Sequence, residues 1–220
     1  MHHSLSEDLS WCVCAGRAVF LDMPRNCYFC LADADDAAFR RWAAGEPVEP
    51  VPAALQRLVE RGVLVRSEKT AGTLPAYVEP ATRDLAVEGA GGARMSAALR
   101  AALDQMRIQW MLRRHPIAAI VRRHHGPVAG WSGPGEALAE ARRIAGVLAT
   151  TALLLGKADR CLPRALVARA LCARRGLASM LVFGVRMEPF AAHCWVQWGD
   201  AVIVGDLEQS RMFTPILALP

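Results

Sequence analysis

Lysine is almost absent from this sequence, and so are the segments that would place it in or across a membrane. All but two of the 26 basic residues are arginine, and the exceptions are Lys69 and Lys157. The longest charge-free apolar stretch runs from Ile144 to Gly156, which is too short to span a bilayer. The opening residues, MHHSLSEDLSW, lack the charged-then-apolar pattern of a signal peptide. We therefore expect a soluble protein that is located in the cytoplasm and has no membrane partner.

The sequence also lacks a disulfide framework and any motif for nucleic-acid binding. Seven cysteines are an odd number, and no signal peptide accompanies them, so we expect reduced thiols. The net charge of +5 includes short basic clusters at residues 113–114 and 122–125, which match no RNA- or DNA-binding motif. They predict solvated helix faces or, in a second interpretation, contact with an acidic peptide. With 53% hydrophobic residues, 220 residues suffice for a core in one or two domains.

Three segments carry the residues of a nucleophilic enzyme. DRCLPRALVARALCARRG places Cys161 before a predicted helix, FAAHCWVQW places His193 on a predicted strand, and VIVGD ends the next strand at Asp206. Pro163 is tolerated only in a first helical turn, so the helix is expected to begin just after the cysteine. A thiol at a helix N-terminus has a lowered pKa, and the adjacent N–H groups can bind an oxyanion. The set is what a cysteine acyl-transfer or peptide-cleaving enzyme needs.

The register of the predicted hairpin brings His193 and Asp206 together. Gly199-Asp200 is a credible two-residue turn, which pairs Trp198 with Ala201 and, at the same register, His193 with Asp206. Their side chains are then expected on one face, where the carboxylate orients the imidazole. A loop with an odd number of residues would shift this register. Two alternatives remain: Asp159 supplies the carboxylate, or Cys161 and His193 are merely packed in the core.

The remaining cysteines predict packing rather than chemistry. Cys12, Cys14, Cys27 and Cys30 have the residue types of a zinc site, but a spacing of three puts the last two on opposite faces of a strand, so no metal is expected. Cys172 has no base near it in sequence and is predicted to pack inside its helix. Trp195 shares the strand face of His193 and is predicted either to wall the active site or to pack in the core.

The hydrophobic periodicity and the Gly and Pro residues that interrupt it predict an α+β fold with two domains. The first 70 residues suggest strands at 11–15, 18–22 and 27–31, helices at 33–45 and 51–62, and a short strand at 63–66, which is winged-helix-like in outline. Residues 71–93 are rich in Gly, Pro and small side chains and predict a linker. Helices follow at 95–115, 117–126, 136–156 and 162–176, then strands at 179–186, 193–198 and 201–205 and a C-terminal tail.

The segments around Cys161 and His193 resemble the transglutaminase-like cysteine protease of lasso peptide biosynthesis, the leader peptidase or B protein. The resemblance covers roughly residues 94–213 and rests on CLPRALVARALCARRGL and AHCWVQWGDAVIVGD. It implies a transglutaminase-like, papain-like fold over residues 94–220 and a catalytic set of Cys161, His193 and Asp206. The family commonly reads H-A-W, where this chain has Cys194, a position that alternates away from the face of His193. It commonly has an Asn-Asp-like pair where this chain has Gly205-Asp206.

Residues 1–70 resemble the PqqD-like precursor-recognition domain that precedes the protease in fused members of this family. The resemblance implies that a leader peptide adds as a strand to the third strand, against the last helix. It assigns leader binding to these residues: Cys27, Tyr28, Phe29, Cys30, Leu31, Leu55 and Leu58.

Together, the two resemblances imply an enzyme that cleaves the leader from a ribosomally synthesised precursor peptide. The protease itself needs no cofactor, and a partner, the ATP-dependent lasso cyclase, uses ATP to close the ring. Two other functions remain open, a transamidating enzyme and a non-catalytic leader-binding scaffold.

Overall fold

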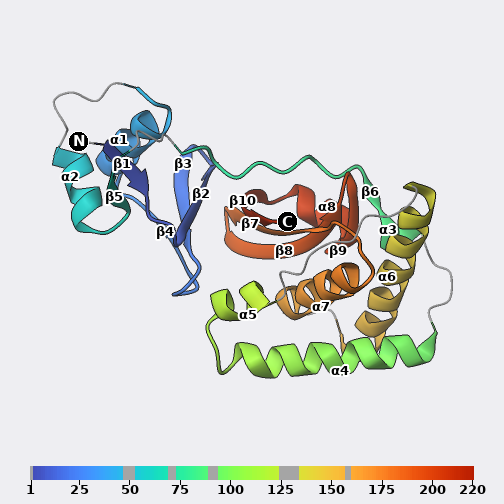
Figure 1. The fold of residues 1–220 in the computed structure, drawn as a ribbon. Helices are drawn as coiled ribbons and strands as arrows, with labels where there is room; N and C mark the ends of the chain where they lie inside the picture. The colour runs from blue at the N-terminus through green and yellow to red at the C-terminus, as the bar shows by residue number, and fades with distance from the viewer. Residues whose placement is uncertain (1, 47–52, 69–72, 89–93, 124–133, 157–159) are drawn as a thin grey trace. The chain divides into compact units, whose positions relative to one another are not determined.

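The computed structural model describes residues 2–46, 53–68, 73–88, 94–123, 134–156 and 160–220. The chain forms two compact units, Met1–Tyr77 and Val78–Pro220 (Figure 1). Both contain helices and strands, which confirms the predicted α+β class. Among the residues described, no helix is long and apolar enough to cross a membrane.

The first unit combines a three-stranded antiparallel sheet with two helices and a two-stranded ribbon. The sheet has the order β2-β3-β4, and β1 pairs with β5 in the ribbon. The elements are β1 (His2–Leu5), β2 (Leu9–Cys14), β3 (Arg17–Asp22), β4 (Cys27–Cys30), α1 (Asp33–Ala43), α2 (Ala53–Glu60) and β5 (Leu64–Ser67). The turn between β2 and β3 lies at Ala15 and Gly16, both with positive φ, one residue earlier than predicted. Strand β1 was not predicted, because β5, the strand with which it pairs, lies about sixty residues away.

Aromatic side chains and buried carboxylates hold the first unit together. Phe39 of α1 contacts Trp11 and Phe20 of the sheet at ring-centroid distances of 4.9 and 4.8 Å. Asp36 is buried and accepts a hydrogen bond of 2.7 Å from the backbone N–H of Ala18, which fixes α1 to β3. Asp35 is paired with Arg57 of α2, and this hydrogen bond lowers the pKa of the Asp35 carboxyl.

The second unit is a five-stranded sheet with helices packed against it. The strand order is β10-β7-β8-β9-β6, and only the β6–β9 pair is parallel. The strands are β6 (Arg83–Asp84), β7 (Met180–Met187), β8 (Phe190–Trp198), β9 (Ala201–Val204) and β10 (Thr214–Leu219). The helices are α3 (Leu85–Glu88), α4 (Met95–Leu112), α5 (Ile117–Arg123), α6 (Pro134–Leu155), α7 (Cys161–Arg174) and α8 (Leu207–Arg211).

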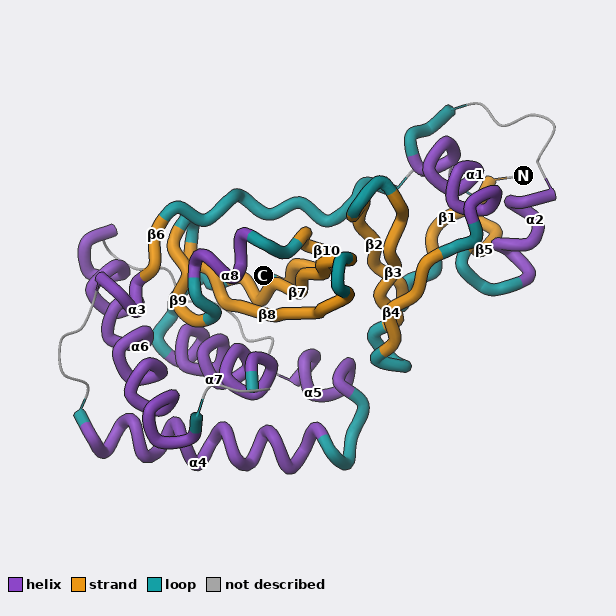
Figure 2. Tube along the Cα trace, turned by 180° about the vertical axis from the view of Figure 1, so that it is seen from behind, coloured by secondary structure: helices purple, strands orange, loops and turns teal. Residues whose placement is uncertain are grey.

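The sheet of the second unit is covered on both faces. Helix α7 packs against β7, β8 and β9, and α4 and α6 pack against α7 on that side (Figures 1 and 2). Across the other face, Val182, Trp195 and Val202 form a core cluster with Val78, Ala81 and Phe213. Alternate side chains of the strands therefore serve two different cores, which explains why β7 and β9 are apolar almost throughout.

Two segments that we predicted to be unstructured belong to this unit. The predicted linker 71–93 contains β6 and α3, and the predicted tail contains α8 and β10, which pairs with β7 at the sheet edge. The Arg169 side chain donates to the carbonyls of Leu219 and Pro220 and so fixes the chain end to α7. Two residues of parallel pairing carry no sequence period, so β6 was invisible to periodicity.

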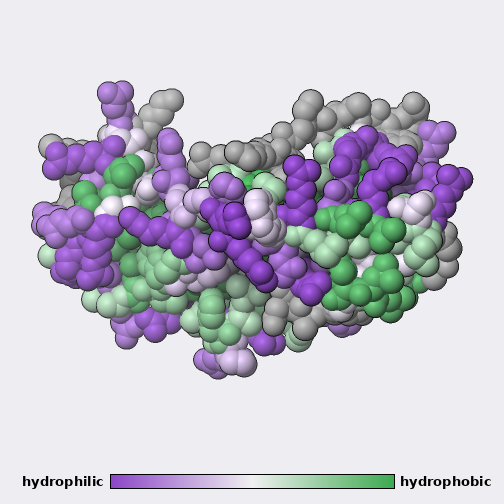
Figure 3. Space-filling view, turned by 90° about the horizontal axis from the view of Figure 1, so that it is seen from below, coloured by the Kyte–Doolittle hydropathy of each residue, from purple (hydrophilic) through white to green (hydrophobic). Residues whose placement is uncertain are grey.

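Helix α4 has a covered face of mainly small residues and an exposed stripe of large apolar ones. Ala98, Ala101, Ala102, Gln105 and Ile108 are buried. The exposed stripe consists of Met95, Leu99, Leu103, Met106 and Trp110. Seen from the α4 side, hydrophobic surface gathers over part of the molecule (Figure 3).

Candidate active site

Cys161 and His193 meet at a pocket in the second unit. The pocket has a volume of about 630 Å³ and is lined by residues of α3, α6, α7, β8 and β9. Both of these side chains line it, together with Cys194 and Asp206. The structure thus gathers at one pocket three residues of which the first and the last lie 45 positions apart in the sequence.

Cys161 is the first residue of α7, so this helix begins one residue earlier than predicted. Its pKa is lowered from 9.0 to about 4. The main cause is a hydrogen bond from the Cys194 thiol, which outweighs the opposing effect of burial, and His193 contributes a further hydrogen bond and its charge. Hydrogen-bond donors and positive charge favour the thiolate over the thiol. Cys161 is therefore a thiolate at neutral pH.

His193 is buried and held in one orientation from two sides. Its Nε2 lies 3.1 Å from the Gly205 carbonyl oxygen. Its ring stacks on Trp195 at 6.1 Å and lies 5.2 Å from the Phe213 ring. Since a carbonyl oxygen only accepts, Nε2 must carry the proton of that hydrogen bond, and the other ring nitrogen is left for Cys161. Trp195 packs in the core, as one of its two predicted roles requires, and supports the histidine from there.

The hairpin that carries His193 keeps the predicted turn but not the predicted register. Trp198 pairs with Ala201 and Gln197 with Val202 across Gly199-Asp200, as expected. The register then shifts, and Val196 pairs with Val204, which leaves Ile203 as an extra residue on β9. The prediction that His193 and Asp206 lie directly opposite each other is therefore wrong.

Asp206 lies beyond β9, at a positive φ of 70°, and caps helix α8. Its Oδ1 accepts a hydrogen bond of 3.1 Å from the backbone N–H of Gln209. The place expected for its carboxylate, at the far nitrogen of His193, is taken by the carbonyl of the preceding residue, Gly205. Asp206 thus lines the pocket and shapes the turn that presents this carbonyl.

Gly205 is a residue that this turn requires. Its φ is +136°, and an added Cβ would lie 2.3 Å from the Cβ of Trp195. A side chain at this position would push the turn away from Trp195 and with it the carbonyl that holds His193. The departure from an Asn-Asp-like pair therefore has a local steric reason in this chain.

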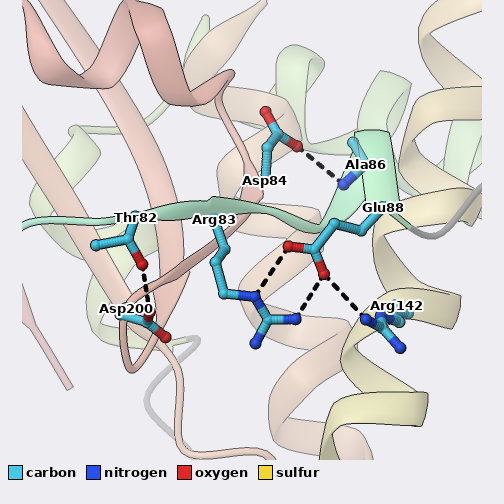
Figure 4. Close-up of polar contacts among 7 residues, drawn as sticks. All are labelled: Thr82, Arg83, Asp84, Ala86, Glu88, Arg142 and Asp200. Carbon is cyan, nitrogen blue, oxygen red and sulfur yellow. Dashed lines mark hydrogen bonds and ion pairs between the residues drawn. The ribbon is translucent and has the colours of Figure 1, made fainter.

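Asp84 is a pocket residue that the sequence did not reveal. It lies on β6 beside β9, and its Oδ2 accepts a hydrogen bond of 3.0 Å from the backbone N–H of Leu207. Its Oδ1 accepts from Ala86 N at 2.9 Å (Figure 4). The carboxylate therefore ties α3 to the turn after Asp206. No spacing or motif marked it, because it reaches the site only through β6.

The same strand is fastened at both of its ends. Thr82 donates to the carboxylate of Asp200 in the hairpin turn, which holds this carboxylate away from the pocket (Figure 4). Arg83 and Arg142 both bind the Glu88 carboxylate and lower its pKa to about 2. The other carboxylate considered for the catalytic role, Asp159, lies outside the described residues.

The residues assigned to leader binding lie in the first unit. Strand β4 is an edge strand of its sheet. Cys27 and Cys30 are exposed, and Tyr28 and Phe29 are half-buried. The other three assigned residues, Leu31, Leu55 and Leu58, are buried in the core of the unit. What β4 offers a ligand is therefore its edge rather than the side chains of α2.

The other cysteines are arranged for packing. Cys12 and Cys14 are buried, and burial is the main cause that raises the pKa of Cys12 to about 12. Cys172 is buried in α7, and burial raises its pKa to about 11. Within the described ranges, no three His, Cys, Asp or Glu side chains are placed to share a metal ion.

A family model described as the transglutaminase-like superfamily matches residues 102–218. The chain therefore belongs to this superfamily, whose members are mostly cysteine hydrolases. Comparisons with curated proteins and with solved structures gave no significant match. The matched region includes Cys161, His193 and Asp206, whereas the pocket residue Asp84 lies before it.

Proposed function

We propose that this protein is a cysteine peptidase that removes the leader from a ribosomally synthesised precursor peptide, in the maturation of a lasso peptide. The observation that carries the proposal is the pair formed by Cys161 and His193 at the N-terminus of α7, with the thiol pKa lowered to about 4. The superfamily supports the cysteine chemistry. The resemblance of the two segments around Cys161 and His193 to the lasso leader peptidase supports the choice of substrate.

The proposed reaction uses the residues in fixed roles. The Cys161 thiolate attacks the carbonyl carbon of the last leader residue, and the backbone N–H groups of Cys161 and Leu162, which precede Pro163 at the start of α7, stabilise the oxyanion. His193 gives its proton to the departing amine of the core peptide. It then takes a proton from water, which attacks the thioester and releases the leader carboxylate. Gly205 holds the imidazole through its carbonyl, and Asp206 and Asp84 position that turn.

Transamidation is the second candidate, because it passes through the same thioester and ends on an amine instead of water. The shape of the pocket gives no preference, whereas the resemblance favours hydrolysis. The test incubates the protein with a synthetic lasso precursor peptide in H₂¹⁸O, with a primary amine added. We expect one ¹⁸O in the carboxylate of the released leader and no amide product by mass spectrometry. If the mass of the released leader is increased by that of the amine, the protein is a transamidase and not a peptidase. If the protein binds the leader but does not cut the precursor, it is a non-catalytic leader-binding scaffold.

The proposal assigns leader recognition to the first unit, where the leader adds to β4 at the edge of the sheet. The backbone N–H groups of a strand point alternately to its two sides. Every second residue of β4 therefore directs its N–H to the outer edge, and the residues between direct theirs to β3. Cys27 and Cys30 have opposite parity and exposed side chains, so replacing them costs no core packing.

We therefore compare Cys27→Pro with Cys30→Pro. The variant whose N–H points outward should stay folded and lose leader affinity by about 1–3 kcal/mol, since it removes a donor and adds strain. The other should break pairing with β3 and lower the melting temperature. Leader affinity by fluorescence anisotropy and thermal unfolding separate the two. Normal leader binding by whichever variant remains folded would place recognition elsewhere than on β4.

The proposal also includes a partner, the ATP-dependent lasso cyclase, which closes the ring on the freed core N-terminus. ATP is used by that partner.

A further inference from the structure

Cys194 is a pocket residue that neither forms a bond to the substrate nor carries a proton in the proposed peptidase reaction. The H-A-W pattern of the resembled family has alanine at this position, and we expected Cys194 to point away from the chemistry. Instead, Cys194 is 3% exposed, lines the pocket and donates a hydrogen bond to the sulfur of Cys161. The Cys194 thiol thus lies at the same pocket as the nucleophile and within hydrogen-bonding reach of it.

We propose that Cys161 and Cys194 form a hydroperoxide-sensitive disulfide, in which Cys161 is oxidised first and Cys194 resolves it. The inference rests on the proposed function only in that both use the same reactive thiol. The reagent is a hydroperoxide, with hydrogen peroxide as the simplest member of the class. The disulfide would reversibly close the site, because a sulfur bound in S–S is no longer a nucleophile.

The two sulfurs differ in the way that such a pair requires. Cys161 is half-buried and lines a pocket of about 630 Å³, so a small oxidant has access to it. It is a thiolate, which is the form that hydroperoxides attack. Cys194 is buried, and its hydrogen bond to Cys161, its burial and the neighbouring thiolate charge together raise its pKa. It therefore stays a protonated, unreactive thiol while Cys161 is reduced.

Oxidation of Cys161 reverses this difference. The Cys161 thiolate attacks the terminal oxygen of the hydroperoxide, the O–O bond breaks, and the leaving alkoxide, or hydroxide from hydrogen peroxide, takes a proton from His193. The products are Cys161 sulfenic acid and an alcohol or water, and His193 is left as a base. The sulfenic acid is neutral, so the charge that held the proton on Cys194 is gone. His193 beside the pair takes that proton, the Cys194 sulfur attacks the sulfenic sulfur, and hydroxide leaves and is protonated to water. The hydroperoxide is reduced by two electrons, and the two thiols are oxidised to one disulfide.

The position of the pair in the fold favours this disulfide over others. Sulfurs that already share a hydrogen bond need only close to the S–S length of about 2.05 Å. Cys172, the other cysteine of α7, lies eleven residues further on, or about 16 Å along the helix axis, and cannot reach Cys161. The remaining cysteines, Cys12, Cys14, Cys27 and Cys30, belong to the other compact unit.

The test exposes the full-length protein to hydrogen peroxide and maps its cysteines by peptide mass spectrometry. We expect the wild type to form the Cys161–Cys194 disulfide and to regain all of its iodoacetamide labelling at Cys161 after dithiothreitol. Cys194→Ser keeps a hydrogen-bond donor beside Cys161 but has no resolving sulfur. It should proceed to sulfinic acid at Cys161, with at least tenfold less labelling recovered. Cys172→Ser is the matched control, since it removes a buried cysteine of the same helix, and it should behave as the wild type.

Two results would overturn the proposal. One is sulfinic acid at Cys161 in the wild type at the same rate as in Cys194→Ser. The other is a recovered protein whose disulfide joins any other cysteines. If the disulfide forms but the precursor is not cleaved, the proposed peptidase activity is wrong and the proposed disulfide stands. If the precursor is cleaved but the disulfide does not form, the peptidase activity stands and the proposed disulfide is wrong.

Discussion

The Cys161→Ala protein is expected to bind the leader with unchanged affinity and to leave the precursor uncut. Cys161 supplies the thioester sulfur, and no other cysteine of the second unit lies at the N-terminus of α7: Cys172 and Cys194 are buried within the helix and the sheet. Loss of a nucleophile that acts as a unit with its base lowers kcat by roughly 10⁶-fold. Leader affinity should not change, because the proposed binding edge lies in the other compact unit. Mass spectrometry of the precursor and fluorescence anisotropy of a labelled leader measure the two effects.

The matched control for this experiment is Cys172→Ala. Cys172 lies on the same helix and is buried, but burial raises its pKa to about 11, so it is no nucleophile. This variant should cleave at nearly the wild-type rate, with at most a modest loss of stability from the small cavity. Cleavage that persists in Cys161→Ala would end the thioester mechanism. Loss of leader affinity in Cys161→Ala would mean that the two units do not divide binding and chemistry as proposed.

Elements fixed by local sequence were predictable, and elements fixed by distant partners were not. Helices α4 and α7 have apolar periodicity over several turns, and β8 and β9 are joined by a two-residue turn, so all four were predicted close to their observed bounds. Strands β1 and β6 are short, and these two and β10 pair with partners far along the chain. Nothing in so few residues distinguishes a strand from extended chain until the partner is known.

In the active site, too, the features fixed by local sequence were predictable and those fixed by distant pairing were not. Cys161 and His193 were predictable, because a helix start and a strand position each depend on a few neighbours. The partner of His193 was not, since it depends on one extra residue, Ile203, in β9. A bulge moves every later residue of its strand relative to the next one. The same extra residue is consistent with a backbone carbonyl, rather than a carboxylate, facing the imidazole.

His193→Ala and Asp206→Asn are expected to differ widely in effect, because only one of these side chains touches the nucleophile. His193→Ala removes the proton carrier, so cleavage should fall by about 10²–10⁴-fold. It should also raise the pKa of Cys161, since His193 contributes a hydrogen bond and charge that lower it, although the hydrogen bond from Cys194 remains. Iodoacetamide labelling of Cys161 near pH 6 should therefore slow, while labelling at high pH, where the thiol is ionised in both proteins, should not.

Asp206→Asn should preserve both structural roles of Asp206, the cap of helix α8 and the turn at positive φ. Asparagine also caps helices and tolerates positive φ, so it can accept the hydrogen bond from Gln209 and keep the φ of 70°. The Gly205 carbonyl then stays on His193, and cleavage should fall by less than about tenfold, which corresponds to under 1.4 kcal/mol. Asp200→Asn, which changes a carboxylate in the hairpin turn that faces Thr82, is the control for a lost charge and should cleave normally. If Asp206→Asn were as inactive as His193→Ala, the carboxylate itself would have to act on the imidazole during the reaction. The turn would then have to move in the substrate complex, and the carbonyl of Gly205 would be its partner only in the free enzyme.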